Sequence, residues 1–123
     1  MRFPLYFLLS FFLLCISCSP FSKSNLVGHW TAVSVLQKDI PLEVNHSEIT
    51  LSFTQNDTYN FTSTLDYKEA GSYQLNGQKL ITTDTLQKPP ASKTVLIDKL
   101  SSDTLRINMK NQSDWMLLTM IKK

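Results

Sequence analysis

The sequence predicts an all-β protein, an eight-stranded antiparallel up-and-down β-barrel that follows an N-terminal signal peptide. Three observations support this class. Beyond residue 25, short segments of alternating apolar and polar residues follow one another at regular spacing, which is typical of sandwiches and barrels. Clusters of Asn, Asp, Gly, Pro and Ser separate them. Eight strands also suffice to close a meander and remove its edges, so a barrel is favoured over a two-sheet sandwich.

The first element is a secretory signal over residues 1–17. Arg2 supplies a positive charge ahead of an apolar run from Phe3 to Ile16, which is the usual layout of such a signal. A membrane-spanning helix is the alternative. The run is shorter than the roughly 20 residues that a spanning helix needs, so the signal peptide is favoured.

Cys18 is the predicted site of lipid attachment. The segment 13–18 resembles the bacterial lipobox, with the small residue Ser17 directly before the cysteine. Cys15 stands where that pattern usually has Leu, and it follows the bulky Leu14, so it is not the acceptor. Both cysteines lie in this leader, and the exported domain is therefore expected to contain no disulfide. The alternative is an ordinary signal peptide followed by an unmodified thiol.

Residues 18–25 are expected to form a flexible lipidated tether, because Ser and Pro disfavour regular structure there. Buried acyl chains contribute about 0.8 kcal/mol per CH₂, so two or more chains would hold the protein stably on a membrane. Ser19 follows the cysteine in place of Asp. By resemblance to known sorting rules, this favours the outer membrane of a cell envelope, with the domain facing the periplasm.

Residues 26–123 then form the predicted barrel. In the clearest strand, Ile49, Leu51 and Phe53 alternate with polar residues, and the next strand places Tyr59, Phe61 and Leu65 on one face. The eight strands are expected at residues 30–36, 48–54, 58–65, 69–75, 78–84, 93–99, 104–109 and 115–121.

One hairpin also has a predicted register. The dipeptide Asn76-Gly77 is typical of a two-residue type I′ turn. That turn would pair Leu75 with Gln78, Tyr73 with Leu80 and Gly71 with Thr82. A residue without a side chain at position 71 would then allow the strand to bend strongly.

The segment Leu26-Val27-Gly28-His29-Trp30 resembles the Gly-x-Trp signature of lipocalins and of the lipocalin-like domains of bacterial lipoproteins. Segments 53–59, 71–75 and 100–105 are similar to later strands of that group, so the resemblance covers nearly the whole domain. It implies that Gly28 and Trp30 form the fold signature, with Trp30 closing the base of the barrel beneath a basic residue of the last strand. Here Arg106 lies one strand earlier, and Lys122 and Lys123 lie just past the expected end of the last strand, so the covering residue stays open.

The resemblance further implies binding of a small hydrophobic molecule inside the barrel. The aromatic residues Trp30, Phe53, Tyr59, Phe61 and Tyr73 are expected to point inward. They can either fill the lumen as core or line a pocket, since eight strands enclose little space. Phe53, Tyr59, Phe61 and Tyr73 are the candidate ligand contacts, and an opening is expected near Phe61 and Tyr73.

Other functional classes lack a signal in the sequence. Basic and acidic residues are scattered, twelve against ten, and form no concentrated basic face for nucleic acid. No nucleophile is recognisable beside a base, so no enzyme activity or catalytic residue is predicted. His46 lies near Glu43 and Glu48, but three ligand types in a loop are too few for a structural zinc site. No metal or other cofactor is predicted, and His29 is expected to point outward at the rim.

Two functional hypotheses therefore stand. In the first, an envelope lipoprotein binds a small hydrophobic ligand in its barrel. In the second, a filled barrel contacts another envelope protein as an interaction or inhibitor module. A cavity of about 300 Å³ or more would favour the first, and an exposed apolar patch of several hundred Å² beside a filled lumen would favour the second.

Overall fold

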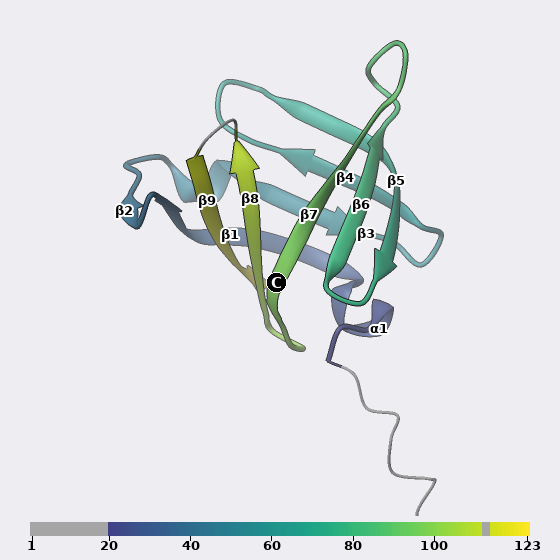
Figure 1. Cartoon of the computed structure of the whole chain (residues 1–123), viewed down its shortest axis with the longest axis horizontal. Helices are drawn as coiled ribbons and strands as arrows, with labels where there is room; N and C mark the ends of the chain where they lie inside the picture. The colour runs from purple at the N-terminus through teal and green to yellow at the C-terminus, as the bar shows by residue number, and fades with distance from the viewer. Residues whose placement is uncertain (1–19, 112–113) are drawn as a thin grey trace, which may run out of the picture.

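The computed structural model describes residues 20–111 and 114–123, so Cys18 and the predicted signal peptide lie outside it. Within these residues, one antiparallel sheet closes into an eight-strand barrel with one additional short strand, β2 (Figure 1). The elements are α1 (Lys23–Leu26), β1 (Gly28–Gln37), β2 (Ile40–Pro41), a 3-10 turn (His46–Glu48), β3 (Thr50–Phe53), β4 (Thr58–Thr62), β5 (Lys68–Asn76), β6 (Lys79–Asp84), β7 (Ala91–Leu100), β8 (Thr104–Asn111) and β9 (Asp114–Lys122).

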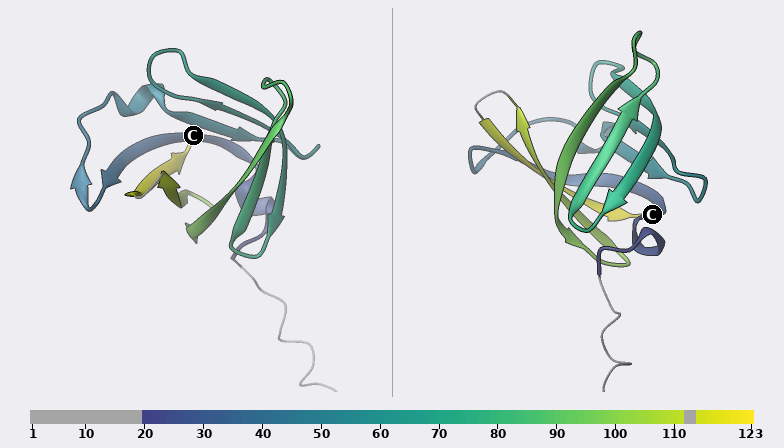
Figure 2. Two further views of the ribbon diagram at one scale, coloured as in Figure 1. Left: turned by 45° about the horizontal axis from the view of Figure 1, so that its top comes forward. Right: turned by 45° about the vertical axis from the view of Figure 1, so that its right-hand side comes forward.

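The barrel closes because β1 pairs with two different strands. Its first residues, Gly28–Thr31, pair with β3, while Trp30–Gln37 pairs with β9. A register shift between Ala32 and Ser34 bends β1, as bulges do, and lets one strand serve both neighbours. The curved sheet is visible in both views of Figure 2. The predicted all-β barrel is confirmed, and the two-sheet sandwich is excluded.

All eight predicted strands are present, with bounds that differ from the predicted ones by up to three residues. The strand predicted from residue 48 begins at Thr50, because His46–Glu48 forms a 3-10 turn that Asn45 caps. The next strand ends at Thr62. Leu65 was expected on the inner face with Tyr59, but it adopts φ of 60° in the following turn and is 97% exposed. That part of the prediction is wrong, because the turn interrupts the alternation.

The predicted register of the hairpin between β5 and β6 is also wrong, by two residues. Leu75 pairs with Leu80, Tyr73 with Thr82 and Gly71 with Asp84. The loop consists of Gly77 and Gln78, and the positive φ of 58° falls on its first residue, Gly77. Glycine at the first loop position is typical of a type II′ turn, whereas type I′ needs positive φ at both positions.

The segment before the barrel is more ordered than the predicted tether. Ser22 caps a single helical turn, α1, by accepting a hydrogen bond from the backbone N–H of Asn25. Phe21 packs against the core, and Leu26 is fully buried in it. The prediction of a flexible segment up to residue 25 is thus wrong for residues 23–25, since apolar neighbours anchor this turn to the end of the barrel.

The core fills the barrel interior with alternating residues from every strand of the closed sheet. Ile49, Leu51 and Phe53 are buried, as their spacing predicts. The fully buried large side chains are those of Trp30, Tyr59, Leu26, Leu80, Ile97, Leu105 and Met120. No helix in the described ranges has both the length and the apolarity to cross a bilayer.

Candidate ligand-binding site

One end of the barrel is closed by Trp30 and α1. The Trp30 side chain is fully buried, and its indole N–H donates to the backbone carbonyl of Leu26 at 2.8 Å. The Lys122 ammonium lies 4.9 Å from the centroid of the Trp30 ring and donates to the carbonyl of Asn25 at 2.9 Å. Such an ammonium above an aromatic face is attractive. Lys122, on β9, therefore covers this end of the barrel.

Gly28 completes the closed end because of its backbone. It has φ of 142°, a conformation that other residues rarely adopt. A Cβ built on Gly28 would also lie 3.1 Å from Cε of Lys122. The absence of a side chain at Gly28 thus allows Lys122 to approach the ring of Trp30.

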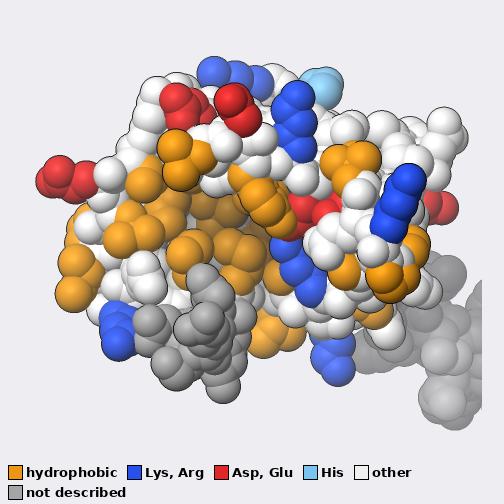
Figure 3. All heavy atoms as spheres, turned by 90° about the horizontal axis from the view of Figure 1, so that it is seen from above, with side chains coloured by type: hydrophobic (Ala, Val, Ile, Leu, Met, Phe, Trp, Pro, Cys, Tyr) orange, Lys and Arg blue, Asp and Glu red, His pale blue; other side chains and the backbone are white. Residues whose placement is uncertain are grey.

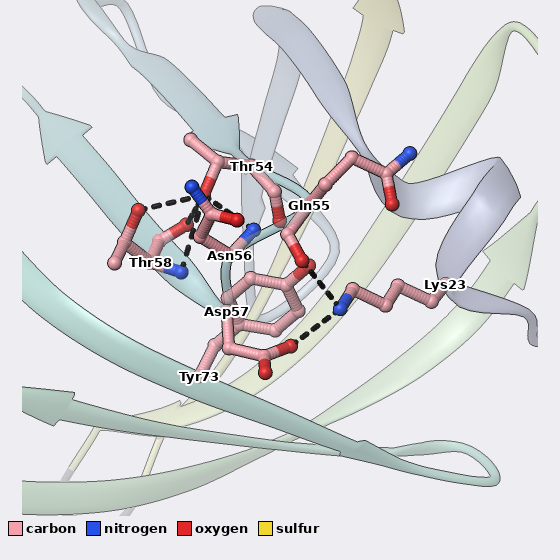
Figure 4. Close-up of polar contacts among 7 residues, drawn as sticks. All are labelled: Lys23, Thr54, Gln55, Asn56, Asp57, Thr58 and Tyr73. Atoms are coloured by element: carbon pink, nitrogen blue, oxygen red, sulfur yellow. Dashed lines mark hydrogen bonds and ion pairs between the residues drawn. The ribbon is translucent and has the colours of Figure 1, made fainter.

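Tyr73 also lies at this closed end. Its hydroxyl donates to the carbonyl of Thr54 at 2.8 Å, and its ring meets that of Phe53 edge to face at 4.9 Å between centroids. Figure 4 shows the ring beside the turn after β3, where the Lys23 ammonium donates to Asp57 and to the carbonyl of Gln55. The expectation that Tyr73 marks the opening is wrong, because it lies at the opposite end from Phe61.

The other end of the barrel is open and holds a cavity of about 430 Å³, here called the mouth. Its apolar walls come from four strands and the β4–β5 turn. Figure 3 looks onto this end and shows hydrophobic side chains gathered in a hollow. The mouth is lined by Phe61, Ser63, Tyr67, Glu69, Lys93, Thr94, Val95, Met109 and Met116.

A small lumen of about 50 Å³ lies below the mouth. Phe53 and Tyr59 line it, and Phe61, Glu69, Lys93, Val95 and Met109 line both spaces. Of the four candidate contacts, Phe61 lines both spaces, whereas Phe53 and Tyr59 line the lumen and not the mouth. Side chains fill most of the lumen, so of these two spaces the mouth alone exceeds the roughly 300 Å³ expected of a ligand pocket.

A third cavity, of about 510 Å³, lies beside α1 at the closed end. Its walls include the Lys23–Asp57 ion pair and polar side chains of β5 and β6 such as Ser72 and Thr83. It has no connection through shared lining residues with the lumen. The mouth is the better candidate for an apolar ligand, because it shares lining residues with the barrel lumen and five of its nine lining residues are apolar or aromatic.

The floor of the mouth contains a buried carboxylate, Glu69, which is not among the residues predicted from the sequence pattern. Glu69 on β5 is 4% exposed. It accepts hydrogen bonds from the hydroxyls of Tyr59 at 3.0 Å and Tyr67 at 2.7 Å, and from the ammonium of Lys93 at 2.7 Å. A buried charge is tolerated only when such partners replace water.

These contacts fix the charge states. Burial alone would raise the pKa of Glu69, but the hydrogen bonds from Lys93 and Tyr67 outweigh it and hold the pKa below its ordinary value. The hydrogen bond to Glu69, together with burial, raises the pKa of Tyr67 to about 12. Near neutral pH the mouth therefore presents an ionised carboxylate bound by neutral phenols.

The sequence contained one usable signal for Glu69. It occupies the same face of β5 as Tyr73, four residues away, and is therefore an inward position. Its partners Tyr67 and Lys93, and the methionines Met109 and Met116, gave no comparable signal, because only barrel closure brings them together.

The histidines do not belong to this site. His29 is exposed on β1, as expected, with Nδ1 2.7 Å from the hydroxyl of Ser52. In the part of the chain that the structure describes, no group of three or more His, Cys, Asp and Glu side chains could hold a metal ion. Glu43 and Glu48 are exposed in the loop beside His46.

Comparison with known proteins adds no relative to these observations: no protein-family model matches the chain, and no curated protein matches it. The class that the fold and the site define is therefore a small closed β-barrel with one sealed end and one apolar mouth.

Proposed function

We propose that this chain is a membrane-anchored, lipocalin-like lipoprotein that binds a small hydrophobic ligand in the mouth of its barrel. The main support for this proposal is the mouth of about 430 Å³, whose apolar lining residues Phe61, Val95 and Met109 also line the lumen. The resemblance of the Gly28-His29-Trp30 segment to lipocalins supports it, as does Lys122 above Trp30. Lipid on Cys18 would hold the barrel at the periplasmic face of an outer membrane.

A ligand here would lie at the opening and not deep in the core. Met109 and Met116 are flexible, polarisable side chains on β8 and β9, a type that adapts to apolar ligands of different shape. Phe61 and Tyr67 stand across the opening with their rings 6.1 Å apart, edge to face. Such walls favour a molecule with an unbranched or planar apolar part.

The binding proposal is tested by titrating the purified chain with octan-1-ol and following amide chemical shifts by NMR. Met116→Lys should weaken binding at least about tenfold, since a desolvated ammonium opposes an apolar ligand. Ile121→Lys is the matched control, because Ile121 lies on the same strand with an exposed side chain. Equal affinity for the two variants would contradict the proposal.

The anchoring proposal has a separate test in cells supplied with labelled palmitate. The unchanged chain should carry the label, and Cys18→Ala should remain an unlabelled, unprocessed precursor. Cys15→Ala should still be labelled. A labelled Cys18→Ala variant would refute the lipid site without affecting the binding test.

The second hypothesis, an interaction or inhibitor module in the envelope, also has specific support. Exposed apolar side chains surround the open end, among them those of Ile40, Leu65, Tyr67, Leu86 and Trp115. They would serve a protein partner as well as a ligand. We favour ligand binding, because a flat contact does not need the hollow between these side chains.

A further inference from the structure

The buried carboxylate of Glu69 is held rigidly in the floor of the mouth. Two tyrosine hydroxyls bind it, one from β4 and one from the turn before β5. Both donors are neutral, so they satisfy its lone pairs without cancelling its charge. Removing such a carboxylate from water is costly, and an apolar residue would fill the same place more cheaply. The site therefore maintains a fixed negative charge that needs a cation.

Lys93 supplies that cation from a solvent-accessible position. Its side chain is about half exposed, at 51%, whereas Glu69 is buried. Its ammonium lies 2.7 Å from Oε2 of Glu69 and 6.0 Å from the centroid of the Phe61 ring. A carboxylate and an aromatic face together form a favourable environment for an ammonium group. The flexible lysine stem can carry its ammonium out to solvent, whereas Glu69 cannot leave.

A second polar group lies in the same space. Thr82 is 6% exposed and lines the lumen together with Glu69 and Lys93. Its hydroxyl lies near the Tyr59 hydroxyl and partly offsets the rise in the pKa of that phenol. Polar side chains therefore gather at the floor of the mouth, within walls that carry apolar residues.

We propose that the mouth binds amphiphiles with an ammonium head and an apolar tail, and that the head displaces the Lys93 ammonium from Glu69. This inference rests on the proposed ligand-binding function and specifies the chemical class of the ligand. The tail lies against Met109, Met116 and Val95, which line the mouth around the ion pair. Lys93 then acts as an intramolecular placeholder that keeps Glu69 paired when the mouth is empty.

Charge distinguishes this class from its alternatives. An anionic head would enter beside the fixed carboxylate of Glu69 and be repelled at short range. A neutral alcohol would leave the Glu69–Lys93 pair in place and gain only apolar contacts. An ammonium head regains the contacts that Lys93 gives up, namely the carboxylate and the ring face of Phe61. Figure 3 shows acidic and basic groups next to one another at the edge of the apolar hollow.

The test uses three probes with one tail, octylammonium, octan-1-ol and octanoate, titrated into the full chain and followed by NMR. We expect octylammonium to bind most tightly and octanoate most weakly. Lys93→Ala should tighten octylammonium binding by about tenfold, because the competitor is gone, and leave octan-1-ol unchanged. Lys79→Ala is the matched control, an exposed lysine on β6 that pairs next to the turn at the closed end.

The outcomes separate the two proposals. Equal binding of the three probes would overturn the ammonium inference and leave the ligand-binding function standing. Tighter binding of octanoate would overturn it too, and would make Lys93 an anion site. Failure of all three would overturn both proposals. Glu69→Gln should abolish the preference for octylammonium over octan-1-ol. If that variant does not fold, the order of affinities of the three probes for the unmodified chain tests the ammonium inference.

Discussion

At each end of this barrel a lysine ammonium lies near an aromatic ring, but one end is closed and the other is open. At the closed end, the ammonium of Lys122 covers the fully buried ring of Trp30, and α1 lies beneath it. At the open end, the ammonium of Lys93 stands near the half-buried ring of Phe61, and no element covers it among the described residues. The same pair of groups thus seals one end and leaves the other accessible.

Their surroundings explain the difference. Lys122 donates to the backbone carbonyl of Asn25, in the segment before β1. This hydrogen bond fastens that segment to the end of the barrel. Lys93 is bound to a side chain, Glu69, which also accepts hydrogen bonds from Tyr59 and Tyr67. A lysine ammonium beside an aromatic ring is thus bound to fixed backbone at one end of the barrel and to a side-chain carboxylate at the other, and the proposed exchange of Lys93 depends on that difference.

Removing Trp30 should produce the largest effect on stability. Trp30→Ala is expected to lower the free energy of unfolding by about 3–5 kcal/mol, because it leaves a cavity in the sealed end. Trp115→Ala serves as the control, since that side chain is 49% exposed at the other end, and it should cost about 1 kcal/mol or less. Denaturant unfolding followed by circular dichroism measures both. Equal losses would show that the two ends do not differ in packing.

Glu69→Gln should have an intermediate and pH-dependent effect. At pH 7 the variant is expected to lose about 1–3 kcal/mol, because Lys93 and both tyrosines lose a charged acceptor. The pKa of folded Glu69 lies below its ordinary value, which is about 4.3 in an unfolded chain. Its stabilising contribution is therefore complete above that pH and is lost as the pH falls through the folded pKa.

The difference in the free energy of unfolding between the unmodified chain and Glu69→Gln should consequently become smaller as the pH falls from 7 to 3. Denaturant midpoints at the two pH values measure it, and Glu43→Gln on the exposed loop is a matched control with little expected effect at either pH. A difference that stays constant down to pH 3 would mean that Glu69 is not the stabilising carboxylate of the mouth.

The smallest effect is expected at the rim. Leu65 is 97% exposed with φ of 60°, a conformation that Asn tolerates better than Leu. Leu65→Asn should change the free energy of unfolding by less than about 1 kcal/mol, towards greater stability, and leave octan-1-ol affinity unchanged. Weaker binding in this variant would extend the site beyond the mouth and favour contact with a larger partner.

Much of the fold follows from local patterns, and much of the site does not. The alternation of Ile49, Leu51 and Phe53 predicts both a strand and its buried face, and Gly28 with Trp30 predicts the first strand. Alternation assigns a residue to a face but gives no height along the barrel axis. Phe61 and Tyr73 were therefore both expected at the opening, although they lie at opposite ends.

Register and charge pairing need information that local sequence lacks. The turn forms on Gly77-Gln78 and not on Asn76-Gly77, which shifts β6 by two residues and keeps every side chain on its expected face. Glu69 and Lys93 are 24 residues apart. They meet through the pairing of β6 with both β5 and β7, so their ion pair follows from topology and not from spacing.

The pairing of β1 with β9 has a consequence for how this protein folds. It joins Trp30–Gln37 with Met116–Lys122, so the last contact needed for the barrel lies between strands from opposite ends of the domain. Contacts between residues so far apart in the sequence form slowly. The chain between them must lose conformational entropy before the hydrogen bonds of the strand pair form. Until β9 is in place, β1 and β8 expose unpaired edges that can join another chain. A chain that folds after passing through a membrane would therefore be most prone to aggregation just before its final strand arrives.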